Sequence, residues 1–295
     1  MKQAILVKHA MLVGHVLPVA HVPLVAHVPP IGHVPPVGHV RHVRHVRQAI
    51  LAAAFALSIS IAGAPAASAQ TPSVPEYVAK AAADPARAED RGIDDRRKAP
   101  ELVAFSEAKP GDKVLELIPG SGYFTKVFSK VVGPEGRIYA VWPKEYDEST
   151  DKMKAVAAEY GNVDVLVQPA AKLEAPAPVD VVFTSQNYHD YPDKFMGPTD
   201  PAILNKAVFA ALKPGGTYIV VDHTAAAGSG LRDTETLHRI DPATVKQQVL
   251  AAGFEFVGES DVLHNPTDDH TKNVFDPSIR GRTDQFAYKF RKPAR

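Results

Sequence analysis

Short apolar runs alternate with longer amphipathic runs from Lys109 almost to the carboxyl end of the chain. Short apolar runs bounded by turn residues are typical of buried strands, whereas the runs between them have helical length and period. Parallel strands need a crossover connection, which is usually a helix, so this alternation predicts a parallel sheet with helices on both faces. The pattern therefore places the domain in the α/β class.

Seven strands and four long helices are expected from this alternation. The expected strands are Lys113 to Ile118, Arg137 to Trp142, Val163 to Val167, Val179 to Thr184, Thr217 to Asp222, Phe254 to Ser260 and Gln285 to Phe290. The expected helices are Tyr123 to Val132, Ser149 to Tyr160, Asp200 to Leu212 and Asp241 to Ala252. No long helix separates the last two strands, so they are expected to form an antiparallel hairpin. The predicted fold is a Rossmann-like, seven-stranded, mostly parallel sheet.

The segment 70–108 precedes the alternation and is expected to be a linker followed by helices. It is Pro-rich at its start and then rich in alanine and charged residues, with Pro85 and Gly92 expected to interrupt the helices. Two interpretations remain open for these helices, a solvated cover over the sheet edge and a substrate lid. The domain itself is expected to span 109–295.

The segment 1–40 contains a low-complexity His-Val-Pro repeat. Its histidines recur every six residues, at His15, His21, His27, His33 and His39. Imidazole is a good ligand for zinc, copper or nickel, so a histidine-rich metal-handling protein is one hypothesis. Regular Pro-Val-His units have few means of building a hydrophobic core, and we therefore exclude this segment from the predicted fold.

The segment 41–69 has the order of a secretory signal peptide. Three arginines precede an uncharged apolar run from Ile50 to Ala62, and the small residues Ala67 and Ala69 stand just before Gln70. The run is too short for a comfortable membrane span, so we expect cleavage before Gln70 and a periplasmic or secreted protein that is no longer attached to a membrane. The alternatives are an uncleaved anchor and, if the signal is not used, a cytoplasmic protein.

The length of chain before these arginines is unusual for a signal peptide. A normal signal begins only a few residues before its basic residues, whereas here about forty residues precede them. We therefore expect translation to begin near Val40, Val43 or Val46.

The charge distribution excludes some partners. The only charged residues before position 76 are Lys2, Lys8, Arg41, Arg44 and Arg47, and removing these five from the 33 basic residues leaves 28 against 33 acidic ones. A mildly acidic domain is a poor nucleic-acid binder, because phosphate contacts need a concentrated basic face. The chain has no cysteine, which excludes disulfides, thiolate nucleophiles and cysteine-ligated zinc.

A carboxylate and a glycine turn stand at the end of the first expected strand. Glu116 lies within the apolar run, and Gly120 and Gly122 follow it before the first long helix. Glycines allow backbone dihedrals that a side chain would forbid, and such a turn at the carboxyl end of a parallel strand lines a ligand crevice. An anionic Glu116 suits an ammonium or sulfonium ligand and disfavours a pyrophosphate.

This stretch resembles the first motif of class I methyltransferases, an acidic residue followed by Gly-x-Gly-x-Gly. The turn at 212–216 (LKPGG) is similar to the one that precedes the family's fifth strand, and the turn at 252–254 (AGF) to the one before its sixth. The resemblance covers about 103–290. The sequence is also similar to a bacterial group of predicted methyltransferases, which have an E-x-x-P-G-x-G-Y turn and a later Y-H-D.

The resemblance implies S-adenosylmethionine as the cofactor. The cofactor-binding residues that it implies are Glu116, Gly120, Ser121, Gly122, Tyr123, Trp142 and Asn187. The chain departs from the family pattern in three places: Ile118 replaces the first glycine, Trp142 replaces the ribose-binding acid, and the stretch 168–171 (QPAA) lacks the adenine-binding acid. Trp142 can stack on adenine or simply pack in the core, and Glu145 can reach in instead. A nicotinamide dinucleotide is the second candidate cofactor, but Thr125 stands where its third glycine would be.

The end of the fourth expected strand carries the candidate catalytic residues, His189 and Asp190. Methyl transfer needs alignment of the nucleophile with the methyl group and exclusion of water, and a base helps if the acceptor is a hydroxyl or a protonated amine. Histidine titrates in the useful range, and Asp190 can orient it. Asn187 and Tyr188 can hold the substrate or the amino-acid part of the cofactor. The alternative for His189 is that it caps a helix.

Further polar residues are weaker candidates. Asp222 and His223 follow the fifth expected strand, and His238 lies before the last helix. The polar stretch from His264 to Arg282 is expected to be either a substrate lid or a solvated insertion. A metal site composed of His264, Asp268, Asp269 and His270 is conceivable, but no helical i,i+4 pair supports it, so we expect no metal.

The favoured function is methyl transfer from S-adenosylmethionine to a small-molecule acceptor that the sequence does not identify. The alternative is a non-catalytic, exported binding protein of the same fold. An exported protein lacks an evident supply of S-adenosylmethionine, and the missing glycine and ribose acid are consistent with this alternative.

Overall fold

The computed structural model describes residues 73–146 and 150–294. The predicted repeat (1–40) and signal peptide (41–69) lie outside the described residues. No helix in the described part of the chain is long and apolar enough to cross a bilayer.

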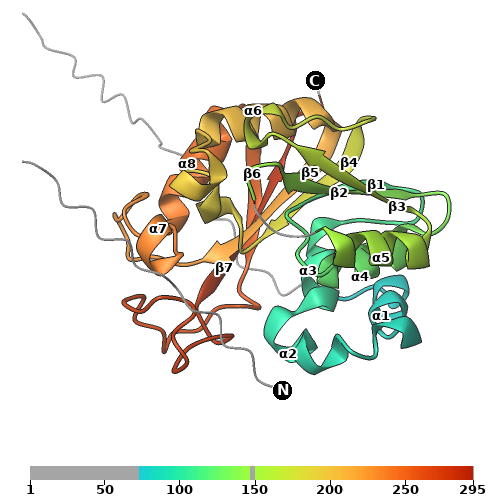
Figure 1. Cartoon of the computed structure of the whole chain (residues 1–295), viewed down its shortest axis with the longest axis horizontal. Coiled ribbons are helices and arrows are strands. Elements are labelled where there is room, and N and C mark those ends of the chain that lie inside the picture. Colours follow the sequence, from blue (N-terminus) through green and yellow to red (C-terminus); the bar gives the residue numbers. More distant parts are fainter. Residues whose placement is uncertain (1–72, 147–149, 295) are drawn as a thin grey trace, which may run out of the picture. The chain divides into compact units, whose positions relative to one another are not determined.

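The fold is built on one seven-stranded sheet with the strand order β3-β2-β1-β4-β5-β7-β6 (Figure 1). The strands are β1 (Lys113–Leu117), β2 (Arg137–Pro143), β3 (Val163–Gln168), β4 (Val179–Ser185), β5 (Leu212–His223), β6 (Glu255–Ser260) and β7 (Gln285–Arg291). Strands β1 to β5 pair in parallel, and β7 runs antiparallel to both β5 and β6. This topology confirms the predicted fold class, including the closing antiparallel pair.

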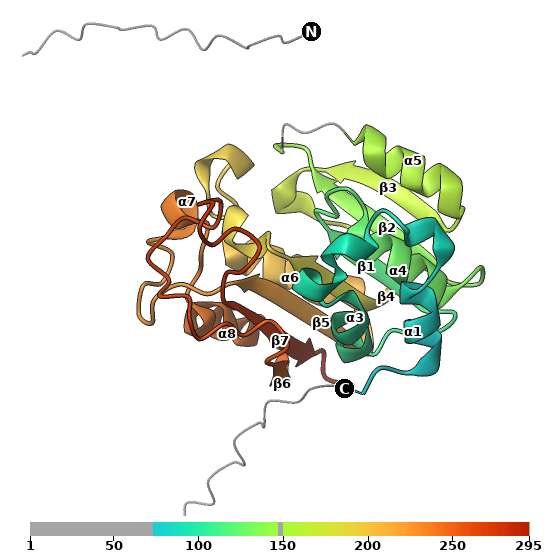
Figure 2. The same ribbon diagram turned by 90° about the horizontal axis from the view of Figure 1, so that it is seen from below.

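Helices cover both faces of the sheet. They are α1 (Glu76–Ala82), α2 (Asp94–Arg97), α3 (Ala99–Ser106), α4 (Tyr123–Val132), α5 (Asp151–Tyr160), α6 (Pro201–Ala211), α7 (Thr234–Leu237) and α8 (Pro242–Ala251). Helices α3, α4 and α5 lie on one face, while α6 and α8 pack together on the other (Figures 1 and 2). Helix α1 packs on α3 and α4, so part of the segment 70–108 completes the first helical layer.

The central strands are apolar because both of their faces are buried. In β1 and β4 nearly every residue is buried, and α4 lays Phe124 and Phe128 onto β4. Their ring centroids lie 4.7 and 5.1 Å from that of Phe183. This contact ties the helix after the glycine turn firmly to the sheet.

Strand β5 begins five residues earlier than the sequence predicts. Leu212 already pairs with Val179, and a register irregularity between Val179 and Val181 accommodates the extra residues. Gly215 and Gly216 bond through their backbones to Lys292, just after β7. The predicted turn is therefore a bulged start of the strand, because a neighbouring strand end supplies hydrogen-bond partners that local sequence cannot show.

The strand order reverses between β1 and β4. The crossovers that start from these two neighbours lead to opposite halves of the sheet, so a crevice opens at their carboxyl ends. Both the glycine turn after β1 and the polar stretch after β4 lie at this point.

Candidate active site

A cavity of about 290 Å³ lies at the carboxyl ends of β1 and β4, and we call it the crevice cavity. Its wall includes seven of the nine residues predicted from the sequence: Glu116, Gly120, Ser121, Tyr123, Asn187, His189 and Asp190. Gly122 and Trp142 do not line it. A neighbouring cavity of about 260 Å³ shares Arg97, His223 and Phe275 with it, so the two form adjoining spaces.

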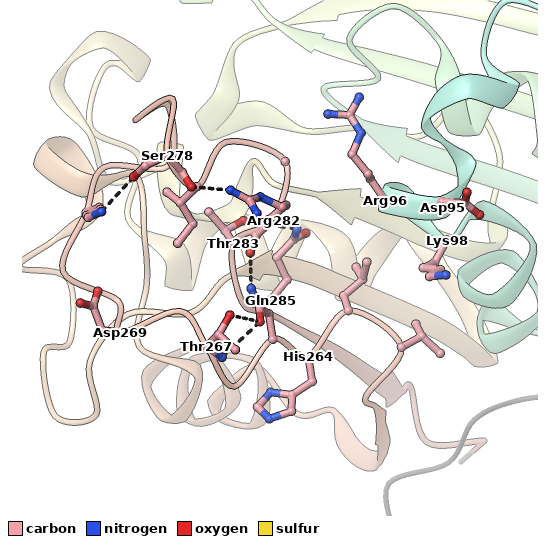
Figure 3. A pocket seen from close by; sticks show the side chains of 16 residues that line it. Asp95, Arg96, Lys98, His264, Thr267, Asp269, Ser278, Arg282, Thr283 and Gln285 are labelled. Carbon is pink, nitrogen blue, oxygen red and sulfur yellow. Dashed lines mark hydrogen bonds between the residues drawn. The ribbon is translucent and has the colours of Figure 1, made fainter.

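A larger cavity of about 560 Å³ lies elsewhere, between the α2 region and the segment 261–284 (Figure 3). Its wall is mostly polar and includes Arg96, Lys98 and Arg282. It contains neither the glycine turn nor the residues that follow β4. Ligands of open α/β sheets bind beyond the carboxyl ends of the strands, so the smaller crevice cavity is the better candidate.

The glycine turn adopts left-handed backbone conformations. The φ angles are +60° at Gly120 and +84° at Gly122. An added Cβ would meet open space at Gly120, but at Gly122 it would lie 3.2 Å from the side chains of Met153 and Val156. Gly120 therefore faces the ligand space, while Gly122 allows the turn to pack against α5.

Ile118 adopts φ +48° although it is β-branched. It stands where the methyltransferase motif usually has glycine, and for such a residue this conformation is a strained outlier. Asn187 Nδ2 donates hydrogen bonds to the carbonyl oxygens of Ile118 (3.1 Å) and Ser185 (2.7 Å). Asn187 thus connects the loop after β4 to the turn after β1 by a hydrogen bond to the strained residue.

Glu116 is buried, 3% exposed, beneath the glycine turn. Burial raises the pKa of its carboxyl to about 8, against the opposing effects of a hydrogen bond from Thr125 and the charge of Arg97. Thr125 occupies the position that a dinucleotide-binding motif would give to glycine. Here its hydroxyl donates to Glu116, which gives the residue a polar role that a glycine could not have.

Arg97 is a wall residue that the sequence analysis missed. It ends α2, its guanidinium carbon lies 5.1 Å from the ring centroid of Tyr123 and 5.0 Å from that of Phe124, and Nη2 donates to Ser185 Oγ at 3.3 Å. The one sign of this role in the sequence was that Arg97 belongs to a charged stretch. The segment 70–108 is thus more than a solvated cover, because it places a cation in the crevice cavity.

The aromatic residue facing the cavity after β2 is Tyr146, not Trp142. Trp142 is 2% exposed and packs edge-on against Tyr146 with ring centroids 5.4 Å apart. Phe195 also lines the cavity, with its centroid 5.8 Å from that of Tyr146. Glu145 points elsewhere and accepts a hydrogen bond from Ala170 N at 2.9 Å. The sequence could not show which of these side chains faces the cavity, because that depends on side-chain direction within the tight turn after β2.

His189 lies in the short 3-10 turn Tyr188–Asp190, with a carboxylate at each ring nitrogen. Nδ1 lies 2.7 Å from Asp222 Oδ1, and Nε2 lies 3.1 Å from Asp190 Oδ1. Burial alone would lower the pKa of His189, but the two carboxylates outweigh it and raise the pKa to about 10. An imidazolium has no lone pair to accept a proton, so the geometry favours a positioning or binding role, and the base role stays a prediction.

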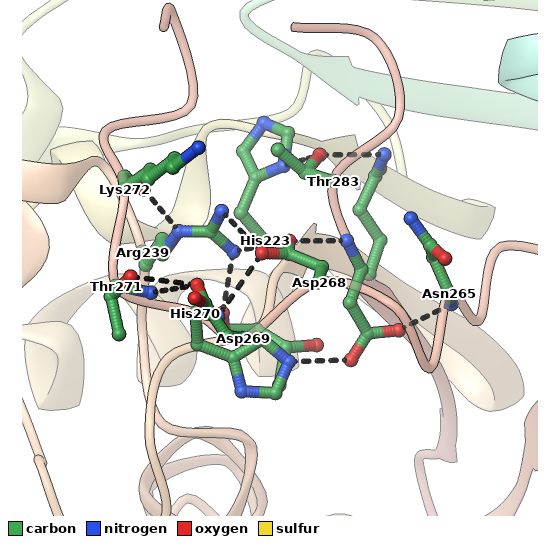
Figure 4. Close-up of polar contacts among 12 residues, drawn as sticks. His223, Arg239, Asn265, Asp268, Asp269, His270, Thr271, Lys272 and Thr283 are labelled. Atoms are coloured by element: carbon green, nitrogen blue, oxygen red, sulfur yellow. Dashed lines mark hydrogen bonds and ion pairs between the residues drawn. The ribbon is translucent and has the colours of Figure 1, made fainter. Parts of the chain in front are cut away.

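The two polar pairs of the sequence analysis form one cluster. Asp222 is fully buried and accepts hydrogen bonds from the backbone N–H groups of His189 and His223, both at 2.8 Å. His223 and His238 both line the crevice cavity. Burial lowers the pKa of His223 well below its usual value, helped by the charge of His189, and Nδ1 lies 2.8 Å from Thr283 Oγ1 (Figure 4).

The polar segment after β6 is organised around a buried ion pair. Arg239 Nη1 lies 2.9 Å from Asp268 Oδ2, and both side chains are fully buried (Figure 4). Asp284 contacts His264 and His270 at 2.9 and 3.0 Å. The segment also contributes Val274 and Phe275 to the wall of the crevice cavity, so it is a folded wall rather than a solvated insertion.

Part of the chain is similar to known methyltransferases. The family model of protein-L-isoaspartate (D-aspartate) O-methyltransferase matches residues 94–202. The protein-L-isoaspartate O-methyltransferase of Ignicoccus hospitalis is 33% identical over 129 residues, which cover 41% of this chain and 54% of that protein. The chain thus spans about half the length of this curated relative.

Solved structures show the fold. A protein from Galdieria sulphuraria, assigned as a sarcosine dimethylglycine methyltransferase, has a TM-score of 0.51 at 13% identity, over 77% of this chain and 94% of that chain. The cyclase SpnF has a TM-score of 0.53 at 17% identity, over 68% of this chain and 81% of that chain. The described domain therefore has the class I methyltransferase fold. The family model and the Ignicoccus hospitalis relative carry the name of the predicted enzyme class, methyltransferase. The narrower bacterial group remains a prediction.

Proposed function

We propose that this protein binds S-adenosylmethionine in the crevice cavity and transfers its methyl group to an acceptor in the adjoining cavity. The observation that carries the proposal is that a buried carboxyl, Glu116, and a guanidinium, Arg97, line the same cavity at the point where the strand order reverses. Each of these groups complements one charge of the cofactor's amino-acid end.

The charged and apolar groups of S-adenosylmethionine complement the residues that line the crevice cavity. The methionine part of S-adenosylmethionine carries an α-ammonium, a carboxylate and the sulfonium. Glu116 suits the cationic groups, Arg97 suits the carboxylate, and the cavity-facing rings of Tyr146 and Phe195 provide apolar surface for the adenine. Because Gly120 has no side chain, the backbone can approach the ligand closely at this point.

The reaction is an in-line displacement. A lone pair of the acceptor attacks the methyl carbon, the carbon–sulfur bond breaks, and its electron pair stays on sulfur, leaving S-adenosylhomocysteine. An acceptor hydroxyl or ammonium also gives up a proton. The enclosed wall favours the reaction mainly by alignment and by exclusion of water.

The acceptor is proposed to be a small molecule that occupies the adjoining cavity of about 260 Å³. Protein isoaspartyl groups are a second candidate, because the matching family model and the Ignicoccus hospitalis relative carry that name. The model matches only residues 94–202, which contain the glycine turn but not the segment 261–284 that walls the adjoining cavity. This favours the small-molecule acceptor.

Calorimetric titration with S-adenosylmethionine and S-adenosylhomocysteine tests the binding step. Gly120→Val should weaken binding about 10- to 100-fold, because a side chain would enter the ligand space. Gly111→Val is the matched control: it also has a positive φ and open space around an added Cβ, but it lies outside the crevice cavity. Equal affinities of the two variants would contradict the proposed site.

Production of S-adenosylhomocysteine tests the transfer step. Isoaspartyl peptide and a panel of small hydroxyl and amine compounds would be supplied with the cofactor. Turnover with a small compound supports the proposal, and turnover with the peptide alone supports the second acceptor. Tight binding without any turnover would favour the non-catalytic binding protein.

We also propose that the protein is exported. The support is the order of basic, apolar and small residues in 41–69.

A further inference from the structure

We propose that His189, Asp190 and His238 together bind one divalent first-row transition-metal ion in the wall of the crevice cavity. Each residue offers one ligand atom, and the three atoms lie within 4.8 Å of one another. The sequence analysis expected no metal. His238 lies 48 residues after Asp190 and 49 after His189, so no local spacing joins the three residues.

The interatomic distances are close to those of a real site. Asp190 Oδ1 lies 3.1 Å from His189 Nε2 and 3.9 Å from His238 Nδ1. In a tetrahedral site with bonds of about 2.1 Å, the ligand atoms lie about 3.4 Å apart. These two separations lie within about 0.5 Å of that value, and the third pair, His189 with His238, lies within 4.8 Å. Small movements of the side chains toward a common centre would therefore place the three atoms around one ion.

Asp222 supplies the support that metal-bound histidines commonly have. Its carboxylate lies 2.7 Å from His189 Nδ1 and is fully buried. A carboxylate at one ring nitrogen holds the N–H there, so the lone pair of a neutral ring is at the other nitrogen and points at the metal. In His189 that other nitrogen, Nε2, is the one that faces Asp190.

The buried carboxylates around these three residues also favour a bound cation. Asp190, Asp193 and Asp222 are all at most 6% exposed, and Asp193 Oδ2 has no hydrogen-bond partner. Within the ranges that the structure describes, no lysine or arginine nitrogen lies within 4.0 Å of these carboxylates. Asp190 and Asp222 pair with histidines, and Asp193 Oδ1 accepts a hydrogen bond from Thr234. Buried carboxylates are costly unless they are paired or coordinate a metal.

The donor set indicates the kind of ion. Two imidazoles and one carboxylate suit Zn²⁺, Fe²⁺, Co²⁺ or Mn²⁺, and three protein ligands leave a position open. All three residues line the crevice cavity, so the open position faces the ligand space. If the proposed methyl transfer is correct, an acceptor hydroxyl can occupy that position, lose its proton to solvent and be held as the nucleophile. The metal site itself does not depend on methyl transfer.

The competing arrangement of the same residues is an imidazolium of His189 held between two carboxylates. Metal binding displaces that proton, so the two arrangements are alternatives and a binding experiment separates them.

The experiment uses the full chain with the eight histidines that precede residue 46 replaced by alanine, because they would bind metal on their own. This chain is dialysed against Zn²⁺ or Co²⁺ at low concentration, its metal content is measured by mass spectrometry, and its melting temperature is followed with and without metal. We expect one ion per chain and a rise in melting temperature.

His238→Asn removes one ligand, and asparagine tolerates the positive φ of +53° at this position. Asp190→Asn removes another. Both should weaken metal binding at least about 10-fold and abolish the rise in melting temperature. His264→Asn is the matched control, since its side chain is 59% exposed and lies outside the crevice cavity.

Absence of bound metal in the parent chain would overturn the proposal, and so would unchanged binding in His238→Asn. Cofactor titration of the same samples separates this outcome from failure of the proposed function. If the protein binds S-adenosylmethionine but no metal, only the metal-site proposal is overturned. If it binds metal but no cofactor, only the methyl-transfer proposal is overturned.

Discussion

At the scale of single residues, the balance between burial and neighbouring charges decides the charge state of each titratable group in the crevice. Glu116 and His189 are both titratable and both at most 3% exposed, yet their surroundings act differently. Glu116 has one hydroxyl donor and a guanidinium nearby, and burial prevails and raises its pKa to about 8. His189 faces a carboxylate at each nitrogen, and these outweigh burial. Neither state follows from residue type alone.

The first residue-scale prediction concerns Glu116 and pH. Because its pKa is raised, Glu116 is protonated in the free folded protein below about pH 8. A cationic ligand favours the ionised form, so affinity for S-adenosylmethionine should increase by up to about ten-fold per pH unit between pH 6 and 8 and then level off. Isothermal titration at several pH values measures this.

Glu116→Gln is the control for that profile. The cofactor's own α-amino group titrates near pH 8, so the rise in affinity below that pH, which the parent shows and the variant lacks, isolates Glu116. The same raised pKa means that the folded state keeps a proton which the unfolded state releases from about pH 4.5 upward. The free energy of unfolding of the ligand-free protein should therefore fall between pH 4.5 and 8, and less so in the variant. Parallel profiles would contradict the assignment.

The second residue-scale prediction concerns Arg97. Arg97→Met keeps much of the side-chain volume against Tyr123 and Phe124 but removes the charge. If Arg97 binds the carboxylate of the cofactor, the affinity for S-adenosylhomocysteine should fall about 10- to 100-fold. Arg96→Met is the control, because Arg96 is exposed and does not line the crevice cavity. Equal losses in both variants would argue against a direct contact.

At the scale of elements, the connection between β6 and β7 differs from an ordinary loop. It has no helix or strand of its own between 261 and 284, but the Arg239–Asp268 pair holds it in place (Figure 4). Asp284 N also donates to Asp268 Oδ2 at 2.7 Å. This network replaces secondary structure as the source of order. Tertiary ion pairs of this kind leave no periodic signal in the sequence.

The prediction for this element is that Asp268→Ala strongly destabilises the fold. It would leave the guanidinium of Arg239 buried and unpaired, which should cost about 3–5 kcal/mol in the free energy of unfolding. Asp269→Ala on the same segment removes an exposed carboxylate that bonds only to Thr271 and should cost less than about 1 kcal/mol. Urea unfolding of both variants measures the difference, and similar midpoints would mean that the pair does not organise the segment.

At the scale of the whole molecule, the prediction concerns export. If 41–69 is a signal peptide, the mature protein should begin at Gln70, because the apolar run is too short to remain as a comfortable span. Mass spectrometry of protein isolated from its native cells should then find an amino-terminal peptide at Gln70 and no peptide from the His-Val repeat. Repeat peptides in the mature species would contradict cleavage.

The sequence by itself determined the sheet, its order of elements and the position of the crevice. Period-two and period-3.6 patterns are local, so the strand at 113–117 and the helix at 123–132 were predicted to within a residue. Chain order and the rule on crossovers then placed the glycine turn beside the stretch that contains His189.

Only the tertiary structure decided which side chains face the crevice. It brought in Arg97 from the amino-terminal helices and His238 from beyond β5, turned Tyr146 rather than Trp142 toward the ligand space, and joined Asp222 to His189. These contacts depend on side-chain direction and on packing between elements far apart in the chain. Neither quantity is encoded in the spacing of neighbouring residues, because a hydrophobic period specifies a buried face but not the partner that covers it.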